Sequence, residues 1–378
     1  MKPKIIRATT VPISLEAFCN GMLRELSEKY EVIALSSPDE KLDEVAEREG
    51  VRVIAVPMER HISLGGDLKS LWKMWRVLCK EKPTMVHSMT PKAGLLCMVA
   101  ARMARVPVRV HTFTGLVFPT SKGLKRRILM LTDKITCACS THIIPEGEGV
   151  KQDLLKNGIT DKPLKVLGFG NVRGVDMQYF SRRPEIMRMA ENLRNKKFFT
   201  FLFVGRIVRD KGINELCYAM DMLSGFAPVR LILVGEYEND LDPISEESKS
   251  IIESKTVIEY VGPKYGDELI AFYAAADCFV LPSYREGFPN TVLEAGAMGL
   301  PSIVTDINGS REIIKDRVNG MIIPSKDKKA LFKVMLEMVR NKPARDRMAS
   351  NARSMIGDRF EQSFVRKCLY NFYDEILK

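Results

Sequence analysis

The segment at residues 274–295 constrains the fold more than any other part of the chain. Its first part, residues 274–281, is a run of small and apolar residues that ends like a buried parallel strand. Gly287 and Pro289 then break the chain, and residues 291–295 have the composition of a first helical turn. Open α/β sheets bind ligands outside the carboxyl ends of their strands, where a helix N-terminus offers free N–H groups. The segment therefore predicts a parallel α/β sheet with an anion, such as a diphosphate, bound at this strand end.

Two acidic residues in the same segment indicate a sugar nucleotide rather than a bare phosphate. Glu286 and Glu294 are eight residues apart, the first on the loop and the second one to two turns into the helix. At that spacing both could face one bound ligand, and neither is placed to neutralise a phosphate. Because ionised carboxylates accept hydrogen bonds from hydroxyl groups, we expect these two residues to bind hydroxyls of the ligand.

Short strands alternate with helical segments in both halves of the chain, which predicts a parallel, doubly wound α/β sheet in each half. A length of 378 residues also favours two domains over one. A glycine-rich, irregular stretch at residues 168–176 separates the halves. The expected strands are residues 4–8, 31–35, 52–56, 85–88, 108–112, 135–138 and 142–144 in the first half, and 199–204, 230–234, 256–260, 277–281, 302–304 and 320–323 in the second.

Several of these segments carry motifs of one enzyme family. Residues 282–295 hold Glu-x7-Glu within Pro-Ser-x-x-Glu-Gly-Phe-Pro-Asn-x-x-Leu-Glu-Ala, which resembles the retaining glycosyltransferases of family 4. Residues 204–212 resemble the phosphate-binding strand and loop of that family, and residues 319–324 resemble its closing strand. Residues 9–15 and 86–94 resemble a narrower branch, the enzymes that build lipid-linked sugars for bacterial surface polysaccharides.

The resemblance runs nearly from end to end and implies the GT-B fold, in which two Rossmann-like domains flank an interdomain cleft. It implies an acceptor-binding domain at residues 1–175 and a nucleotide-sugar-binding domain at residues 176–358. It further implies that the C-terminal helix, at residues 359–378, crosses back to the first domain.

The resemblance also assigns a donor site in the second domain. Arg206 and Lys211 are expected to stabilise the departing diphosphate in place of a metal ion, so no metal or other cofactor is expected. The alternative is that both are ordinary surface charges at a strand end. Glu294 is expected to bind the ribose hydroxyls, and Glu286 the donor sugar close to the reacting carbon. The other donor-binding positions are Gly205, Val261, Gly287, Phe288, Asn290 and Thr291.

On the acceptor side, His111 resembles the active-site histidine of the family. It ends an expected strand in the context Val-His-Thr-Phe-Thr-Gly, which favours a catalytic role over that of a satisfied strand-end residue. Thr9, Thr10 and Ser14 are expected to border the attacking hydroxyl of the acceptor. Lys92, at the start of an expected helix, could meet an acceptor diphosphate.

A net charge of +11 predicts an anionic partner. No zinc finger, RNP motif or basic helical stripe is visible, so nucleic acid is not expected. Basic residues cluster beside apolar ones at 116–131, which favours an anionic membrane surface that would contact Lys122, Lys125, Arg126 and Arg127. The alternative is an ordinary amphipathic helix with a solvated basic face. Residues 67–76 are a second candidate, although their two tryptophans are expected in the core.

The sequence also indicates where such a protein would work. No apolar run approaches the ~20 residues of a membrane span, and residues 1–7 lack the apolar core of a signal peptide. Eight scattered cysteines without metal-ligand spacing fit free thiols in a reducing cytoplasm. We therefore expect a cytoplasmic enzyme, peripheral on the inner face of the cytoplasmic membrane.

Two segments depart from the pattern of the branch. Residues 145–149 read Pro-Glu-Gly-Glu-Gly where a serine-rich turn is usual, and residues 170–174 replace the usual Gly-Ser-x-Asn-Gly. The second segment lies near the expected hinge, so acceptor or donor preference could differ. The intact donor motif argues against a complete loss of activity.

The sequence thus predicts a retaining, metal-independent glycosyltransferase that uses a nucleotide sugar, expected to be a UDP-sugar. The expected acceptor is a polyprenyl-diphosphate-linked saccharide. Two alternatives stay open: a UDP-sugar 2-epimerase of the same fold, and a non-catalytic scaffold that binds sugar nucleotides. A dehydrogenase is disfavoured, because no Gly-x-Gly-x-x-Gly follows the first strand.

Overall fold

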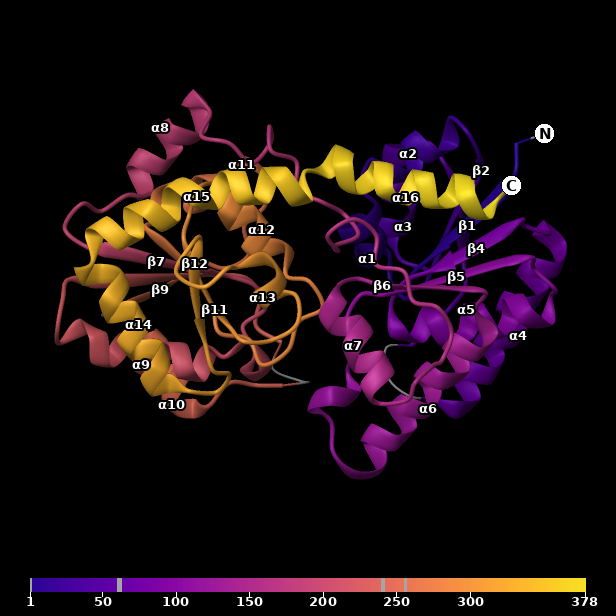
Figure 1. The fold of residues 1–378 in the computed structure, drawn as a ribbon, viewed down its shortest axis with the longest axis horizontal. Coiled ribbons are helices and arrows are strands. Elements are labelled where there is room, and N and C mark those ends of the chain that lie inside the picture. The colour runs from indigo at the N-terminus through magenta and orange to yellow at the C-terminus, as the bar shows by residue number, and fades with distance from the viewer. Residues whose placement is uncertain (1, 60–62, 239–241, 255–256) are drawn as a thin grey trace. The chain divides into compact units, whose positions relative to one another are not determined.

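The computed structural model describes residues 2–59, 63–238, 242–254 and 257–378 (Figure 1). The chain divides into two compact units. The first unit comprises Met1–Arg173 and Val365–Lys378, and the second comprises Gly174–Phe364. The last segment of the chain therefore belongs with the unit that contains the N-terminus.

The first unit is built on a six-stranded parallel sheet in the order β3-β2-β1-β4-β5-β6. Its central strand sets the register, since Ile6 pairs with Ile33 on one side and with Val86 on the other. Residues of β1 and β4 are almost entirely buried, as expected for a parallel sheet with both faces covered. The strands are β1 (Lys4–Ala8), β2 (Glu31–Ser36), β3 (Arg52–Ala55), β4 (Met85–Ser88), β5 (Val108–Phe113) and β6 (His142–Pro145).

Successive side chains of β1 enter two different cores, because strand residues alternate between the faces of a sheet. Ile5 packs in a core with residues of α1, α2, α3 and α16, whereas Ile6 packs in a core with residues of α4 and α5. The helices are α1 (Pro12–Cys19), α2 (Met22–Ser27), α3 (Glu40–Glu49), α4 (Leu64–Glu81), α5 (Pro91–Met103), α6 (Gly123–Cys139), α7 (Glu148–Lys156) and α16 (Gln362–Ile376), with a 3-10 turn at Phe118–Thr120.

The second unit repeats this topology. Its parallel sheet has the order β12-β11-β10-β7-β8-β9, which is the order of the first sheet when each unit is counted from its own first strand. One continuous core, which includes Phe201, Phe279 and Leu293, holds the sheet and its helices together. The strands are β7 (Phe199–Val204), β8 (Val229–Val234), β9 (Ile258–Tyr260), β10 (Cys278–Leu281), β11 (Ser302–Thr305) and β12 (Gly320–Ile323).

Helices cover both faces of the second sheet (Figure 1). They are α8 (Pro184–Leu193), α9 (Ile213–Ser224), α10 (Glu246–Glu253), α11 (Gly266–Ala275), α12 (Asn290–Ala297), α13 (Ser310–Ile313), α14 (Lys328–Arg340) and α15 (Lys342–Phe360), with a 3-10 turn at Arg209–Lys211. None of the helices in the described ranges is both long enough and apolar enough to cross a membrane.

The prediction of two doubly wound α/β domains is confirmed, and one predicted strand is wrong. Residues 135–138 are not a strand, because α6 continues through them to Cys139. Ile135 and Thr136 are β-branched and indicate a strand on propensity alone, but Thr136 donates its hydroxyl to the carbonyl of Thr132 within the helix. The predicted start of a strand at residue 256 lies outside the described residues.

Candidate active site

The second sheet reverses its strand order between β7 and β10, and the loops after these two strands meet there. A Cβ atom on Gly212 would lie 2.1 Å from the carbonyl oxygen of Pro282, and Gly212 has a φ of +73°, so this contact requires glycine. The N–H of Tyr284 also donates to the carbonyl of Asp210 at 2.7 Å. Because ligands bind beyond the strand ends at such a reversal, these loops frame the predicted donor site.

The two loops share an ion pair between predicted site residues. The Lys211 ammonium donates to Glu286 Oε1 at 2.5 Å, and the Ser283 hydroxyl donates to the same oxygen at 2.7 Å. The side chains of Lys211 and Glu286 are only 17% and 11% exposed. Lys211, which is predicted to bind the diphosphate, thus contacts Glu286, the predicted catalytic carboxylate. Sequence reasoning missed Ser283, which precedes Glu286 by three residues in the same motif.

Arg206, the other predicted cation, follows β7 and is half exposed. It forms an ion pair with Glu238. Between the two loops, Arg285 Nη2 lies 2.7 Å from Asp210 Oδ2. Ion pairs near the surface contribute little free energy, so an anionic ligand could replace these carboxylates.

The helix that follows the Glu286 loop, α12, places Glu294, the second acid of the motif, in a buried position. α12 begins at Asn290, and its N-cap residue is Pro289, whose side chain has no hydrogen-bond acceptor. Glu294 is buried and accepts a hydrogen bond from the Tyr273 hydroxyl at 3.1 Å. Tyr273 lies 21 residues earlier, on α11, and no motif in the sequence indicates it.

Phe288, another predicted donor-binding residue, places its ring in the core. The ring packs edge-on against Phe360 with 5.3 Å between the ring centroids. Gly309 packs on the same loop, because a Cβ atom there would lie 2.3 Å from the Gly287 carbonyl oxygen. Phe288 could therefore contact a ligand only through its backbone.

Glycines end neighbouring strands at the same edge of the second sheet. A Cβ atom on Gly235, after β8, would lie 1.8 Å from the carbonyl oxygen of Gly205, after β7. The N–H of Gly235 donates to the carbonyl of Gly262, after β9, at 3.1 Å. Val261 donates its N–H to Leu233 at 3.1 Å and lies at this edge as well. The backbones of these strand ends pack directly against each other, without intervening side chains. The sequence did not predict that Gly235 allows this contact.

The first sheet reverses its order between β1 and β4, where the predicted acceptor-side threonines lie. The hydroxyls of Thr10 and Thr90 are 2.8 Å apart, and Thr10 Oγ1 also accepts the N–H of Ala93 in the first turn of α5. Thr90 has a φ of +59°, a conformation that is strained for a residue with a Cβ atom. Thr9 is fully buried and donates its hydroxyl to the carbonyl of Val11.

Two further predicted acceptor-side residues lie in first helical turns. Ser14 lies in the first turn of α1 and is half-buried. Lys92 lies in the first turn of α5, and its ammonium donates to both carboxylate oxygens of Asp67 at 2.6 Å. An acceptor diphosphate would therefore compete with Asp67, which lies 25 residues earlier on α4.

His111, the predicted catalytic histidine, is buried near the end of β5. Its Nδ1 atom lies 2.9 Å from the Ser88 hydroxyl at the end of β4. Its ring packs edge-on against Phe113, and a Cβ atom on Gly94 would lie 2.4 Å from its Cε1 atom. Burial lowers the pKa of His111 to about 3. The imidazole is therefore neutral at physiological pH and can exchange hydrogen bonds but not act as a cationic acid.

A second buried histidine belongs to a network that the sequence did not reveal. Arg7 Nη1 lies 2.8 Å from His87 Nδ1 and 2.5 Å from the hydroxyl of Tyr373, on α16. Because a guanidinium only donates, Nδ1 accepts and the ring proton is on Nε2, which donates to Thr112 Oγ1 at 2.7 Å. Burial, followed by the charge of Arg7, lowers the pKa of His87 well below its ordinary value. This network attaches the C-terminal helix to the sheet of the first unit.

The two segments that depart from the family pattern contact each other. The N–H of Asn171 donates to the carbonyl of Glu146 at 2.7 Å, and both side chains are buried. Gly147 is the N-cap of α7 and provides no side-chain cap. Within the described ranges, no group of three or more His, Cys, Asp or Glu side chains is arranged to hold a metal ion.

Two family models match the chain. The model described as a glycosyl transferase 4-like domain matches residues 15–170, and the model described as glycosyl transferases group 1 matches residues 187–355. The first match lies within the first unit and the second within the second unit.

Curated relatives extend along most of the chain. The capsular polysaccharide biosynthesis glycosyltransferase CapM of Staphylococcus aureus is 30% identical over 377 residues, which cover 99% of this chain and 98% of the relative. The UDP-Gal:alpha-D-GlcNAc-diphosphoundecaprenol alpha-1,3-galactosyltransferase of Escherichia coli is 30% identical over 321 residues, or 82% of this chain and 81% of the relative.

Solved structures share the fold. Alr3699/HepE of Anabaena, crystallised with UDP, has a TM-score of 0.81 at 17% identity, covering 99% of this chain and 100% of that one. WaaG, a glycosyltransferase involved in lipopolysaccharide biosynthesis, has a TM-score of 0.73 at 16% identity, covering 96% and 98% of the two chains. The predicted GT-B fold is confirmed. Since the identity to CapM extends over almost the whole chain, this protein belongs to the family 4 glycosyltransferases of GT-B fold, in the branch of bacterial surface-polysaccharide synthesis.

Proposed function

We propose that this glycosyltransferase moves a sugar from a UDP-sugar to a polyprenyl-diphosphate-linked saccharide and retains the anomeric configuration. The observation that carries the proposal is the contact of Lys211, Glu286 and Ser283 where the second sheet reverses its order. The printed name of the Escherichia coli relative includes UDP-Gal and a diphosphoundecaprenol-linked sugar, and the HepE structure holds UDP. Both comparisons support this choice of donor and acceptor.

The proposed donor site neutralises the diphosphate without a metal ion. Lys211 and Arg206 would exchange their carboxylate partners, at least in part, for phosphate oxygens. The backbone N–H groups of Phe288, Asn290 and Thr291 would donate to the same oxygens at the positive end of the α12 dipole. Because Lys211 is mostly buried, its charge acts in a low-dielectric surrounding and stabilises the leaving group more than it would in water.

In the proposed reaction, the acceptor hydroxyl attacks the anomeric carbon on the face from which the diphosphate leaves. The acceptor oxygen–carbon bond forms, the carbon–oxygen bond to phosphate breaks, and the hydroxyl proton passes to a departing phosphate oxygen. Glu286 holds a sugar hydroxyl and does not form a covalent intermediate. Glu294, fixed by Tyr273, binds the ribose, and Val261 borders the base.

The first unit would hold the acceptor. His111 is neutral and buried, so we assign it a hydrogen bond to the donor sugar or to the transferred oxygen rather than proton transfer. Thr9, Thr10 and Ser14 would border the attacking hydroxyl, and Lys92 would bind the acceptor diphosphate in competition with Asp67. The enzyme would work as a peripheral protein on the inner face of the cytoplasmic membrane, where lipid-linked saccharides are assembled.

The test is nucleotide release by the purified protein with a panel of sugar nucleotides, with and without a membrane lipid extract. We expect release that rises with the extract for one or two UDP-sugars. Conversion of the donor to its epimer without nucleotide release would instead show the epimerase. Binding of the donor with no turnover under any condition would show the scaffold.

A substitution in the site makes the test specific. Glu286→Gln keeps the size of the side chain and should lower turnover by roughly 10²–10³-fold, a loss of transition-state stabilisation, while UDP binding changes little. Glu246→Gln, on the exposed first turn of α10, is the matched control and should act like the wild type. Equal turnover of the two variants would contradict the proposal.

A further inference from the structure

α6 has an apolar stripe on its solvent side. Leu124, Ile128, Leu131 and Ile135 are 72%, 37%, 57% and 38% exposed. Their spacing of four, three and four residues places them along one face of the helix. Single exposed apolar residues are common, but a continuous exposed stripe marks an interaction site.

α4 has a second exposed apolar site, and here the structure corrects an expectation. Trp72 was expected in the core, but it is 52% exposed, and Leu68 one turn before it is 68% exposed. Trp75 is partly buried and packs against the core. The stacked guanidinium of Arg76 lies 4.7 Å from the centre of the Trp72 ring. The Trp72 side chain points outward because Met74 and Leu78, on the opposite face of α4, are buried against the sheet.

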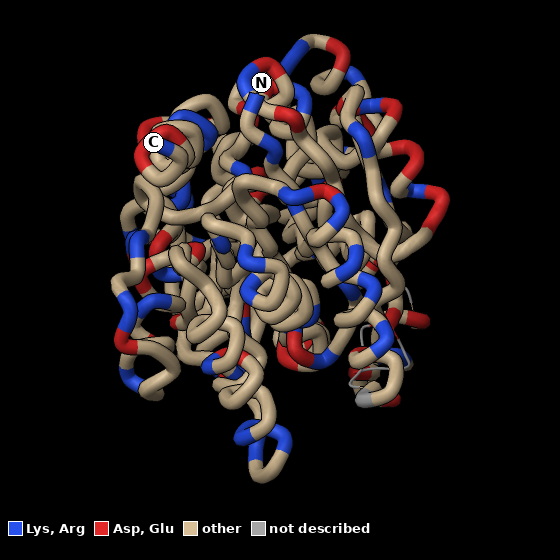
Figure 2. Tube along the Cα trace, turned by 90° about the vertical axis from the view of Figure 1, so that its right-hand side faces the viewer, with Lys and Arg blue, Asp and Glu red and all other residues tan. Residues whose placement is uncertain are grey.

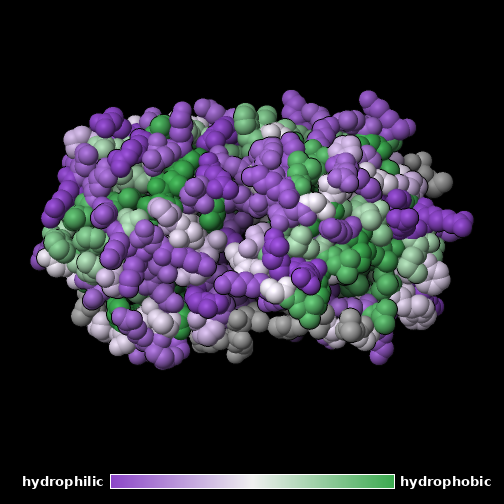
Figure 3. All heavy atoms as spheres, turned by 60° about the horizontal axis from the view of Figure 1, so that its bottom comes forward, coloured by the Kyte–Doolittle hydropathy of each residue, from purple (hydrophilic) through white to green (hydrophobic). Residues whose placement is uncertain are grey.

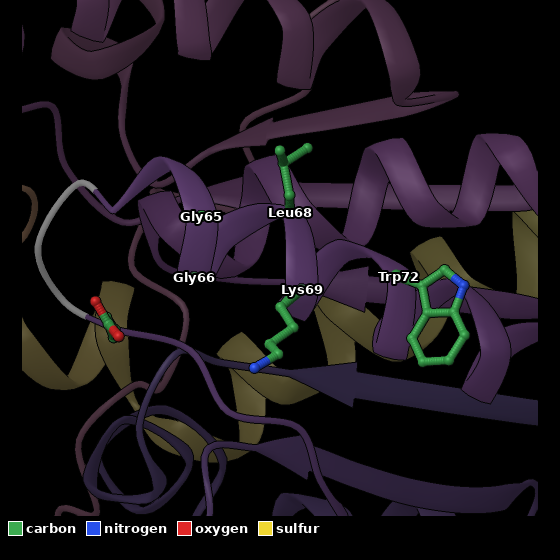
Figure 4. Close-up of a pocket in the computed structure, with 6 residues that line it drawn as sticks. Gly65, Gly66, Leu68, Lys69 and Trp72 are labelled. Atoms are coloured by element: carbon green, nitrogen blue, oxygen red, sulfur yellow. The ribbon is translucent and has the colours of Figure 1, made fainter.

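A shallow hollow lies beside Trp72. Its volume is about 720 Å³, and Figure 4 shows Leu68 and Lys69 pointing to opposite sides of α4, with the Trp72 ring farther along the helix. The lining residues are Glu59, Gly65, Gly66, Leu68, Lys69 and Trp72.

The two apolar sites belong to one layer of helices. α4 packs against α5, and α5 packs against α6. Figure 3 shows hydrophobic surface gathered on the side of the first unit where these helices lie. The residues concerned therefore form one outer surface, which we call the α4–α6 surface and define by Leu68, Trp72, Leu124, Ile128, Leu131 and Ile135.

The exposed charges of α4, α5 and α6 all have one sign, whereas Glu59, on the loop that borders the hollow, is an exposed acid. The exposed charged residues of α4, α5 and α6, together with the residue that precedes α6, are Lys69, Lys73, Arg76, Lys80, Arg102, Lys122, Lys125, Arg127 and Lys134. Figure 2 shows the loop before α6 projecting from the unit with Lys and Arg and without Asp or Glu. The three acidic residues of these helices, Asp67, Glu81 and Asp133, are not exposed.

One residue of the predicted basic group does not join this surface. Arg126 is half-buried, and its guanidinium donates to Asn157 Oδ1 at 2.7 Å and lies over the Phe118 ring. Lys122, Lys125 and Arg127 are exposed, as a contact with phosphates requires.

We propose that the α4–α6 surface binds an anionic lipid bilayer, with its apolar side chains in the headgroup layer and its lysines and arginines on lipid phosphates. The proposal names the partner surface of the proposed function and goes beyond it in assigning the side chains. The apolar stripes match the apolar boundary of the acyl chains, and the flanking cations match the anionic headgroups of such a bilayer. A second copy of this chain fits less well, because two such surfaces would bring like charges together.

The test is binding of the full chain to phosphatidylcholine vesicles with and without phosphatidylglycerol, measured by flotation in the absence of donor and acceptor. We expect binding only to the anionic vesicles, weakened by salt. We also expect the fluorescence of Trp72 to shift to the blue, and Trp72→Phe should abolish that shift. Binding to neither vesicle type, or a concentration-dependent dimer without vesicle binding, would overturn the proposal.

Variants separate the surface from the active site. Leu124→Gln with Leu131→Gln keeps the charge and should weaken vesicle binding at least about ten-fold, because two apolar side chains lose their burial. Lys125→Glu with Arg127→Glu should have a similar effect. Lys196→Glu with Lys197→Glu makes the same charge change on exposed residues of the second unit and should bind like the wild type.

UDP binding without vesicles gives an independent readout. All these variants should bind UDP like the wild type, because none of them lies in the proposed donor site. Normal vesicle binding with no glycosyl transfer would contradict the proposed function alone. If the α4–α6 surface variants bound vesicles like the wild type and kept normal glycosyl transfer, the surface assignment alone would be contradicted.

Discussion

The two units of this protein share one strand order and differ in the chemistry at the point where that order reverses. At the reversal in the second sheet, glycines allow the loops to touch, and Lys211 and Glu286 form an ion pair. At the reversal in the first sheet, the neighbours are threonine hydroxyls, and a buried, neutral histidine lies on the next strand, β5. This difference indicates that the strand order determines where a site forms, whereas the side chains at that place determine which ligand binds.

Each reversal has one lysine held by a carboxylate, which allows a matched comparison. Lys211→Ala should lower turnover about 10²–10³-fold, because it removes a fixed cation from the leaving diphosphate. Lys92→Ala should act through the KM of the lipid-linked acceptor and change turnover at saturation little, since we assign Lys92 to the acceptor side. Steady-state kinetics with both substrates varied would measure this. A purely acceptor-dependent effect of Lys211→Ala would reverse the assignment of the two units.

The close packing of the two donor loops gives the next largest effect. Gly212→Ala places a Cβ atom 2.1 Å from a carbonyl oxygen at a φ of +73°. We expect it to lower the free energy of unfolding by about 2–4 kcal/mol and to weaken UDP binding. Gly225→Ala is the control, since its nearest neighbour would be 3.6 Å away and its φ is negative. Urea denaturation would compare them, and equal stability of the two variants would refute the packing argument.

The smallest expected effect is a difference between the two units in how their stability depends on pH. All four histidines lie in the first unit and none in the second. His87 and His111 have folded pKa values below the unfolded value of about 6.5. The unfolded chain therefore binds more protons, and the stability that they contribute above that pH is lost as pH falls toward the folded values.

One acid in the same unit opposes this loss. Burial raises the pKa of Asp133 to about 7, so its protonated form favours the folded state as pH falls. Burial lowers the pKa of His142 as well, so the histidines outweigh this one acid and we expect the first unit to lose stability as pH falls below about 6. Hydrogen exchange should show lost protection in β4 and β5 before β7 and β10. Equal loss in both units would contradict this account, and Asp133→Asn should make the loss in the first unit steeper.

The elements of the fold were predictable to different degrees. Five strands of the second unit could be read because they are short, mostly buried runs, and β7 and β12 begin and end where the sequence predicts. In β9, by contrast, two of the three residues are exposed. The end of α6 was not predictable, because Ile135 and Thr136 favour a strand by themselves and only the helix around them decides otherwise.

The sequence alone determined the alternation of strands and helices, the Glu-x7-Glu motif and the net positive charge, because these are properties of neighbouring residues. The tertiary structure decided which groups meet. It paired Lys211 with Glu286, Glu294 with Tyr273, and Arg7 with Tyr373, the last across 366 residues. It also turned Trp72 and the α6 stripe outward. Such choices depend on which helix face the sheet buries, and burial is a property of the packed molecule rather than of the local chain.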